Sequence, residues 1–500
     1  MCLSALMVML SALTLVVQPA SANPPVKVEV DVQRVEGPFN TLSGAQGTPL
    51  AFVEQFKACR VARVRFPQDC APNSMTLGGL FPDENADPRQ VASYRFKRID
   101  PHIEAARQAG CEILWQSSYD VGGSDSWKGI NLGGRAPTDM RRWCTVVRRC
   151  LEHFNNGWAR GFDYAVRYVE FVNEPTGLGG FVGARRKDLL PAFIAFLQMV
   201  EDYNRDHPQT PVTPVGPGIP LGMEDWSTFE PGYREMLKSL KKHKQALPVF
   251  SYHSYGKDSS PPAKVRLARA HRKLLDQAGF SRTKLWNTEW QGTTHVKDLL
   301  GVKRSLFKRS YSAEEIARSQ TALATYAIAS KLRYQGLLDG SFYYLATRRA
   351  WPRWRAMVIG ERRMAAGRAR YFATTRPPAQ LAKHELVLAR LADRTGLLCK
   401  TTVTPADGTA TAAVCRSRSG DELAFILCNL SPSVQDFHLE GDLSALSGRP
   451  QATTWLLSAK GLERLKGLGG GTIEREGNRF AGKVSVPPLS TVVIGLEKNQ

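Results

Sequence analysis

The 500-residue sequence contains few residues of the kinds that bind metals. It has nine histidines and nine cysteines, with no Cys-x-x-Cys pair and no two histidines at the spacing of metal ligands. Structural zinc sites are built from such closely spaced pairs. The sequence therefore gives no indication of a structural zinc site.

Long apolar runs are also scarce. The longest, Ala5–Val17, is followed by Ala20-Ser21-Ala22. It is shorter than the roughly 20 residues of a membrane-spanning helix, and small residues at positions 20 and 22 are typical of a signal-peptidase site. We expect residues 1–22 to be a signal peptide, and the mature protein to be secreted or periplasmic without a membrane span. Because no Lys or Arg precedes the run, a retained membrane anchor is the alternative.

Without Cys2, eight cysteines remain, and an even number permits disulfides in an oxidising compartment. Cys399 and Cys415 flank a predicted hairpin and are the pair we expect. Buried thiols are the alternative.

The formal net charge is +21, with Lys and Arg spread over the whole length. The sequence shows no basic amphipathic helix, zinc-finger spacing or aromatic RNA-binding signature, so we expect no nucleic-acid partner. Two interpretations stay open: a solvated basic surface, or attraction to an anionic polysaccharide.

Between Phe52 and Leu345, short apolar segments alternate with longer amphipathic ones, which is typical of parallel strands joined by helices. We expect a (β/α)8 TIM barrel over residues 36–388. An eighth strand before Phe52 would close it; Lys27–Val35 alternates well but also suits a second domain. Seven strands are predicted from their Val, Ile, Phe, Tyr and Trp content: Val61–Phe66, Glu112–Gln116, Tyr168–Asn173, Pro211–Gly216, Pro248–His253, Leu285–Glu289 and Ser341–Leu345.

Three helices are predicted with their ends. Ser312-Ala-Glu-Glu315 is a capping box that begins a helix ending near Gln335-Gly336. Ala263–Ala278 has helical spacing and stops at Gly279, and Thr138–Asn155 begins with Thr138 or Asp139 as its cap.

The pattern changes near Arg390 to short alternating runs such as Leu423–Leu427, Ala452–Leu457 and Thr491–Leu496, separated by turn signals. This predicts a C-terminal antiparallel β-sandwich over residues 389–500. A strand from residues 26–35 would add to it if it does not enter the barrel.

Two predicted strands end in a carboxylate, one at Asn173-Glu174-Pro175 and the other at Thr288-Glu289-Trp290. Counted with an early first strand, these are the fourth and seventh strands, and their ends meet at one mouth of a barrel. Two facing carboxylates are the minimum for cleaving a glycosidic bond, and a separation of about 5–5.5 Å makes the reaction retaining. Strand-end salt bridges are the alternative for either residue.

Other polar residues lie at neighbouring strand ends. His253 and Tyr255 lie at the end of the sixth strand and point to the same side, and Tyr255 is suited to holding Glu289. Arg65 ends the second strand, where its charge would lower the pKa of the nucleophile, and Asn173 is placed to bind a sugar hydroxyl. Glu170 and Asp69 are alternative carboxylates, of which Glu170 would lie deeper and suits the role less.

The segment Ala346–Arg355 follows the last predicted barrel strand and contains Trp351, Trp354 and four arginines. Loops after barrel strands line the active mouth. We expect Trp351, together with Trp290, to contact sugar rings, and the arginines to meet carboxylate or sulfate groups if the substrate is anionic. A solvated basic loop is the alternative.

On these motifs the chain resembles the clan-A glycoside hydrolases, and most of all glycoside hydrolase family 39, the group of β-xylosidases, α-L-iduronidases and exopolysaccharide-acting enzymes. The matching segments are Phe171-Val-Asn-Glu-Pro175, His253-Ser-Tyr255 and Thr288-Glu-Trp290. The resemblance implies a barrel followed by a β-sandwich, with Glu174 as acid/base and Glu289 as nucleophile. Val172 departs from the pattern, since many members have Trp there.

We therefore expect an exported retaining glycoside hydrolase that acts on a poly- or oligosaccharide and needs no metal or organic cofactor. Two alternatives remain: a non-catalytic glycan-binding protein on the same scaffold, and a transglycosylase that shares every named residue.

Overall fold

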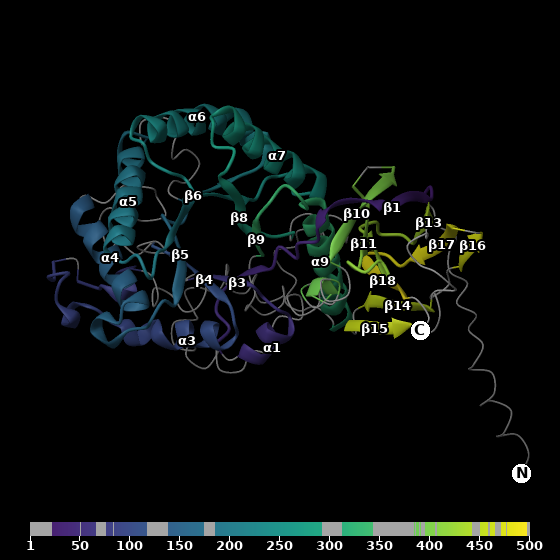
Figure 1. Cartoon of the computed structure of the whole chain (residues 1–500), viewed down its shortest axis with the longest axis horizontal. Helices are drawn as coiled ribbons and strands as arrows, with labels where there is room; N and C mark the ends of the chain where they lie inside the picture. The colour runs from purple at the N-terminus through teal and green to yellow at the C-terminus, as the bar shows by residue number, and fades with distance from the viewer. Residues whose placement is uncertain are drawn as a thin grey trace, which may run out of the picture.

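The computed structural model shows a barrel beside a curled sheet (Figure 1). The proposed signal peptide and the segment that contains Trp351 lie outside the residues that it describes. The described residues are 23–50, 52–66, 77–83, 85–117, 139–174, 186–292, 313–343, 385, 387–389, 391, 396–405, 408–442, 451–458, 461–465, 472–476 and 478–497.

Eight parallel strands close into a barrel in chain order, which confirms the predicted fold. The strands are short and mostly apolar, and the interior below the mouth is filled by Leu114, Val215, Val249, Trp286 and Phe342. Such filling makes the barrel a packed core and leaves its open end to the chemistry. The strands are β2 (Gly44–Gln46), β3 (Arg63–Phe66), β4 (Glu112–Gln116), β5 (Val166–Glu170), β6 (Thr213–Leu221), β7 (Val249–Ser254), β8 (Lys284–Trp290) and β9 (Gly340–Tyr343).

The strand that closes the barrel is β2, which the sequence pattern did not single out. It is only three residues long, Gly-Ala-Gln, and pairs with β3 and β9. A Cβ at Gly44 would lie 2.6 Å from the backbone oxygen of Ser341, so the close approach of β2 and β9 requires glycine. The segment that alternates well, residues 26–35, belongs to β1 (Val26–Pro38) in the other sheet.

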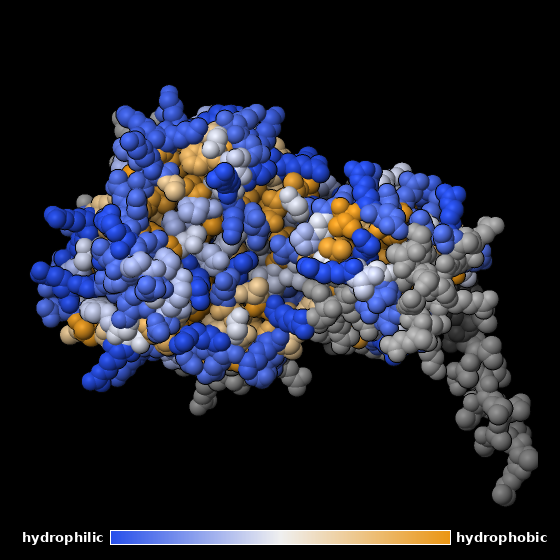
Figure 2. Space-filling view, in the orientation of Figure 1, coloured by the Kyte–Doolittle hydropathy of each residue, from blue (hydrophilic) through white to orange (hydrophobic). Residues whose placement is uncertain are grey.

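Helices surround the barrel, and Figure 2 shows hydrophilic side chains over most of their outer surface. Asp139 caps α4, accepting a hydrogen bond from the backbone of Arg142, which resolves the choice between Thr138 and Asp139. Among the described residues, no helix is both long enough and apolar enough to cross a membrane. The α-helices are α1 (Val53–Ala58), α2 (Leu77–Leu80), α3 (Asp100–Gln108), α4 (Met140–Asn155), α5 (Arg186–Asp206), α6 (Trp226–Lys242), α7 (Pro261–Gln277) and α9 (Ala313–Arg333); short 3-10 helices span Val91–Ser93, Phe96–Arg98, Trp158–Arg160 and Met223–Asp225.

The second sheet has ten strands in the order β15-β14-β18-β12-β11-β10-β1-β13-β17-β16, and it forms the β-sandwich that the sequence predicts. Its neighbours are antiparallel except β1 and β13, which are parallel. Its strands from the C-terminal region are β10 (Leu397–Thr404), β11 (Ala410–Arg416), β12 (Glu422–Asn429), β13 (Gln435–Asp442), β14 (Gln451–Ser458), β15 (Gly461–Leu465), β16 (Thr472–Glu476), β17 (Arg479–Val486) and β18 (Ser490–Glu497).

Helix α9 lies between the barrel and this sheet (Figure 1). Its apolar residues share one core cluster with Trp290 of β8 and with Ile426 and Val493 of the sheet. Arg333 also donates a 2.8 Å hydrogen bond to the hydroxyl of Thr411. The helix therefore covers one face of the sheet and one side of the barrel.

The expected Cys399–Cys415 disulfide is wrong. Both residues are thiols, as are the other described cysteines. In the register of β10 and β11, Cys399 lies opposite Val414, and Cys415 lies opposite Leu398. Because successive side chains of a strand point to opposite faces, Cys399 enters the core inside the sandwich, whereas Cys415 enters the core against α9.

Candidate active site

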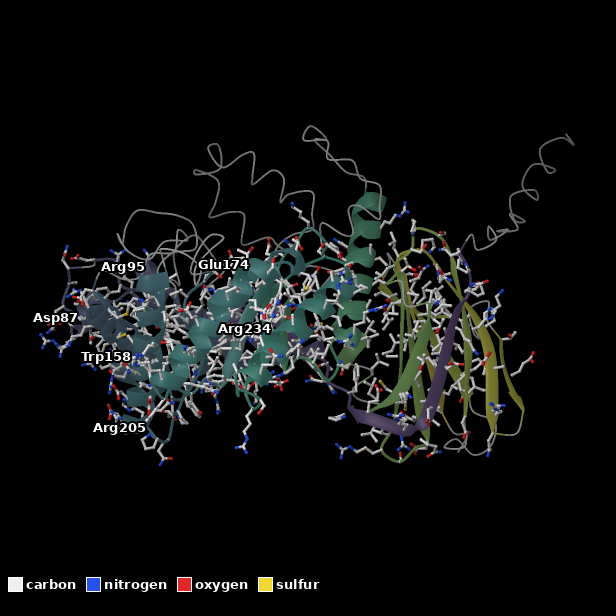
Figure 3. All side chains as sticks on the ribbon, turned by 90° about the horizontal axis from the view of Figure 1, so that it is seen from above. Asp87, Arg95, Trp158, Glu174, Arg205 and Arg234 are labelled. Carbon is white, nitrogen blue, oxygen red and sulfur yellow. The ribbon has the colours of Figure 1, made fainter. Side chains whose placement is uncertain are left out.

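Glu174 and Glu289 lie at the carboxyl ends of the barrel strands. Glu289 is in β8, and its side chain is 7% exposed, whereas that of Glu174 is 27% exposed. β5 ends at Glu170, earlier than the sequence predicts, and the chain turns at Glu174, where φ is 42°. A left-handed φ such as this is costly for a non-glycine residue and marks a position that the surroundings impose. Figure 3 shows Glu174 at one edge of the barrel and Arg205 at the opposite edge.

The two carboxylates are close together, and His253 lies between them. One oxygen of each carboxylate and one nitrogen of His253 all lie within 4.8 Å of one another. His253 Nδ1 is 2.9 Å from Glu174 Oε1 and 3.7 Å from Glu289 Oε2. The site thus holds one nearly buried carboxylate and one partly exposed carboxylate side by side.

The contacts of His253 indicate its tautomer. Its Nε2 lies 3.2 Å from the guanidinium nitrogen Nη2 of Arg65. Because a guanidinium only donates hydrogen bonds, Nε2 must accept, and the ring proton of the neutral imidazole resides on Nδ1. Nδ1 then donates to Glu174 Oε1, so that Arg65 sets the tautomer through which His253 holds Glu174.

Both oxygens of Glu289 accept hydrogen bonds. Oε2 accepts from Gln46 Nε2 and from Arg65 Nη1, each at 3.0 Å, and Oε1 accepts from the Tyr255 hydroxyl at 2.7 Å. Burial opposes ionisation of Glu289, but the nearby His253, the positive charge of Arg65 and the hydrogen bonds from Gln46 and Tyr255 outweigh it and lower the pKa of this carboxyl. Glu289 is therefore held as a carboxylate, the form that a nucleophile needs.

Arg65 is the centre of the buried polar network. Its side chain is 1% exposed and bonds to Glu170 at 2.5 Å, to Glu289 at 3.0 Å and to Asn173 Oδ1 at 3.1 Å. Burial favours the neutral guanidine, but the two carboxylates outweigh it and raise the pKa of Arg65. One guanidinium thus compensates two buried carboxylates, which burial alone would make very costly.

Asn173 is nearly buried beside this network. Its Oδ1 accepts hydrogen bonds from Gln116 Nε2 at 2.8 Å and from Arg65 at 3.1 Å. These two bonds fix the orientation of the amide, as a residue that binds a defined sugar hydroxyl requires.

The structure places Trp290 and Glu170 less favourably than the sequence suggests. Trp290 is completely buried, and its ring packs edge-on against Tyr334 and Tyr343, so it has no surface to offer a sugar. Trp351 and Asp69 lie outside the described residues. Glu170, considered as an alternative carboxylate, lies deeper and is bonded to Arg65 and to the Ser251 hydroxyl at 2.9 Å.

Three polar residues of the network were missed by the sequence analysis: Gln46, Gln116 and Ser251. A signal for two of them exists in the alternation of the strands. Gln116 and Ser251 each follow by two positions a residue of the apolar interior layer, Leu114 and Val249, and residues two apart share a face. A polar residue at this point of a barrel strand faces the mouth.

Glu174, His253 and Glu289 are also a possible donor set for a metal ion, since their atoms lie close enough together. The network does not fit this use. A metal on His253 Nδ1 would displace the ring proton to Nε2, where it would face the donor nitrogen of Arg65 at 3.2 Å. The guanidinium also already supplies the positive charge that these carboxylates need.

Solved glycoside hydrolases have the same architecture. A glucosidase from Croceicoccus marinus is 16% identical, with a TM-score of 0.66 and coverage of 95% of this chain and 99% of that chain. A family 39 glycoside hydrolase from Xanthomonas axonopodis pv. citri is 13% identical (TM-score 0.59, coverage 95% and 98%). A monomeric β-xylosidase from Caulobacter crescentus is 15% identical (TM-score 0.56, coverage 95% and 100%).

The chain has the fold of these glycoside hydrolases. The solved structures with this architecture include members of families 39, 44 and 51, so the fold does not single out one family. No family model matches the sequence, and no curated protein matches it. At such low identities the likeness concerns the fold, and the chemistry has to be argued from the side chains.

Proposed function

We propose that this protein is a retaining glycoside hydrolase, with Glu289 as nucleophile and Glu174 as acid/base. The observation that carries the proposal is the pair of carboxylates with oxygens no more than 4.8 Å apart in different surroundings. So short a separation supports the retaining arrangement, in which the two carboxyl groups lie about 5–5.5 Å apart, over the inverting one, in which they lie about 6.5–9.5 Å apart. The barrel fold that the chain shares with glycosidases supports the same assignment.

In the first step Glu289 attacks the anomeric carbon. Oε2 is held by two nitrogen donors and Oε1 by one hydroxyl, so we assign the attack to Oε1, the less encumbered oxygen. The carboxylate forms a C–O bond as the glycosidic C–O bond breaks, and Glu174, in its protonated form, gives its proton to the leaving oxygen. The product is a glycosyl-enzyme ester and the released alcohol.

In the second step Glu174, now a carboxylate, takes a proton from water as the water oxygen attacks the anomeric carbon. The C–O bond to Glu289 breaks and its electron pair returns to the carboxylate, which Arg65, Gln46 and Tyr255 again stabilise. His253 donates to Glu174 through Nδ1, which keeps this carboxyl group in place through both steps. Two inversions leave the configuration of the sugar unchanged.

Three finer features belong to the same proposal. Export rests on the apolar run and the small residues that end at Ala22, and sequencing the N-terminus of the purified protein tests it. Membership of family 39 rests on the motifs around Glu174, Tyr255 and Glu289. A preference for an anionic glycan rests on the net charge of +21 and on the arginines between residues 346 and 355.

The test is a screen for sugar release by residues 23–500. The panel contains β-glucosides and β-xylosides, because the structural neighbours include a glucosidase and a β-xylosidase, together with xylans, neutral glucans and uronate-bearing or sulfated polysaccharides. We expect release from at least one of them, absent from Glu289→Ala, with the anomeric configuration retained in the first product seen by NMR.

Three other results would argue against the proposed function. Binding of a glycan that is never cut would favour the glycan-binding alternative. Sugar transfer to another sugar in preference to water would indicate a transglycosylase. Inverted product would contradict the assignment of Glu289 as nucleophile.

A further inference from the structure

A lysine is buried just outside the site, on the far side of the strands that carry it. Lys264 lies in the first turns of α7 and is 2% exposed. Its Nζ donates to the backbone oxygen of Ser254 at 2.7 Å and to the Ser254 hydroxyl at 2.9 Å. Burial lowers its pKa to about 7, an effect that the charge of Asp258 only partly offsets.

Both acceptors are neutral, and such a buried ammonium is expensive to keep. A methionine of similar size would fill the space at a lower cost. The contacts of Lys264 therefore serve something other than the packing of α7 on the barrel.

Lys264 binds Ser254, which lies in the sequence between His253 and Tyr255, the two residues that hold the carboxylates. Ser254 is the last residue of β7. On one side of it His253 donates to Glu174, and on the other side Tyr255 donates to Glu289. Any displacement of the Ser254 peptide would move both donors.

Lys264 also reaches the neighbouring strand. Its Nζ lies 5.8 Å from the centre of the Trp290 ring, which is a cation–π contact. Trp290 directly follows Glu289 and pairs with Ser254 across β7 and β8. The ammonium thus contacts the carboxyl ends of both strands at once.

We propose that Lys264 is a positioning residue, which fixes the ends of β7 and β8 so that His253, Tyr255 and Glu289 keep their mutual geometry. The inference rests on the proposed function as far as catalysis is concerned. The role also explains why Trp290 is buried: its ring is the surface against which the ammonium lies. A shift of about an ångström in such a site is enough to slow a reaction considerably.

The experiment replaces Lys264 with methionine in residues 23–500 and follows two properties. Backbone hydrogen exchange, measured by mass spectrometry on the peptide around residues 253–258, reports on the end of β7 without any substrate. We expect exchange there to be about tenfold faster, because the hydrogen bonds from Nζ to Ser254 have been lost. On the substrate found in the screen, we expect kcat to fall about tenfold with KM nearly unchanged, because the reacting groups are misplaced and the sugar still binds.

The matched control is Lys331→Met. Lys331 is equally buried, in α9, and its Nζ is bonded to Glu385, away from β7. We expect this variant to lose stability while its exchange at residues 253–258 and its kcat stay at wild-type values. Should Lys264→Met fail to fold, Ser254→Ala removes one of the two acceptors, and an increase in exchange of about threefold is expected.

The outcomes are distinguishable. Wild-type exchange and wild-type kcat in folded Lys264→Met, or in Ser254→Ala if only that variant folds, would overturn the positioning role. Equal effects from Lys331→Met would overturn it as well, since they would reduce it to general stability. If the wild type cuts no glycan, the proposed function fails, and the exchange data still decide the role of Lys264.

Discussion

The hydrogen bond from Tyr255 to Glu289 gives the sharpest test of how the nucleophile is held. Tyr255→Phe removes one oxygen atom, the donor to Oε1 at 2.7 Å, and leaves the ring in place. Gln46 and Arg65 still bind Oε2, so Glu289 keeps its position. What changes is the stabilisation of its negative charge.

The size of the effect follows from the bond that is lost. A hydrogen bond to a charged group contributes about 1.5–3 kcal/mol, and each 1.4 kcal/mol is about a factor of ten in rate. We expect kcat/KM to fall by about ten- to a hundredfold. Because this hydrogen bond helps to lower the pKa of Glu289, that pKa rises in the variant, and the acidic limb of the pH profile moves to higher pH.

The assay is the pH dependence of kcat/KM on an aryl glycoside of the sugar that the screen identifies. Tyr164→Phe is the matched control. The Tyr164 hydroxyl donates to the backbone oxygen of Pro211 at 2.9 Å, in an exposed position outside the site. Removing it should change neither the rate nor the position of the acidic limb.

A Tyr255→Phe enzyme with an unchanged rate and an unchanged acidic limb would refute this reasoning. The bond would then contribute nothing to the charge on Glu289. A lower rate with the acidic limb moved to lower pH would contradict the sign of the argument, because a lost donor cannot stabilise a carboxylate.

Three further predictions concern charge. Glu174→Gln should lose most activity on glycosides with poor leaving groups and little of the first step on activated ones, and added azide should restore turnover by replacing the activated water; equal losses on both substrates would argue against an acid/base role. Arg65→Met should lower the free energy of unfolding by about 3–5 kcal/mol in urea titrations, because it leaves buried carboxylates uncompensated. The control Arg234→Met breaks the exposed pair with Glu230 and should lower the free energy of unfolding by less than about 1 kcal/mol. Similar losses in the two variants would contradict the role of Arg65 in the buried network. Burial lowers the pKa of Lys264 in the folded protein to about 7. Between about pH 7 and the ordinary lysine pKa, Lys264 is therefore protonated in the unfolded chain and neutral in the folded one, so the free energy of unfolding should rise with pH across this range. Lys264→Met should remove that rise.

The strands of the barrel were predictable where their composition is distinctive. Glu112–Gln116 was predicted with the bounds that the structure has, since Ile, Leu and Trp leave little ambiguity. The first strand was not, because Gly44–Gln46 has no side-chain pattern of its own. It is a strand because of its neighbours: β3 and β9 pair with it, and Gly44 allows the approach. Such pairing depends on tertiary contacts and cannot be predicted from the local sequence.

The candidate site was predictable in its carboxylates and only partly in what surrounds them. The abrupt ends of two apolar runs gave Glu174 and Glu289, and their order along the chain placed them at one mouth. The contacts of Arg65 with Glu170 and His253 depend on which strands become neighbours in space, so a role for Arg65 was predictable from the sequence and its partners were not.

The wrong disulfide prediction shows the limit of arguments from the spacing of cysteines in the sequence. Cys399 and Cys415 lie on adjacent strands, as predicted, yet a register one residue away from direct pairing sends the two thiols to opposite faces. Register is decided by the whole set of apolar contacts on each face of the sheet, and two cysteines flanking a hairpin do not reveal it.

The most direct test of the central claim is covalent trapping of the nucleophile. A 2-deoxy-2-fluoro glycoside of the sugar found in the screen, with a good leaving group, should accumulate the glycosyl-enzyme, and peptide mass spectrometry should place the label on Glu289. Glu289→Ala should take up none. A label on another carboxylate, such as Glu170 or Glu174, or turnover with inversion and no label, would contradict the account.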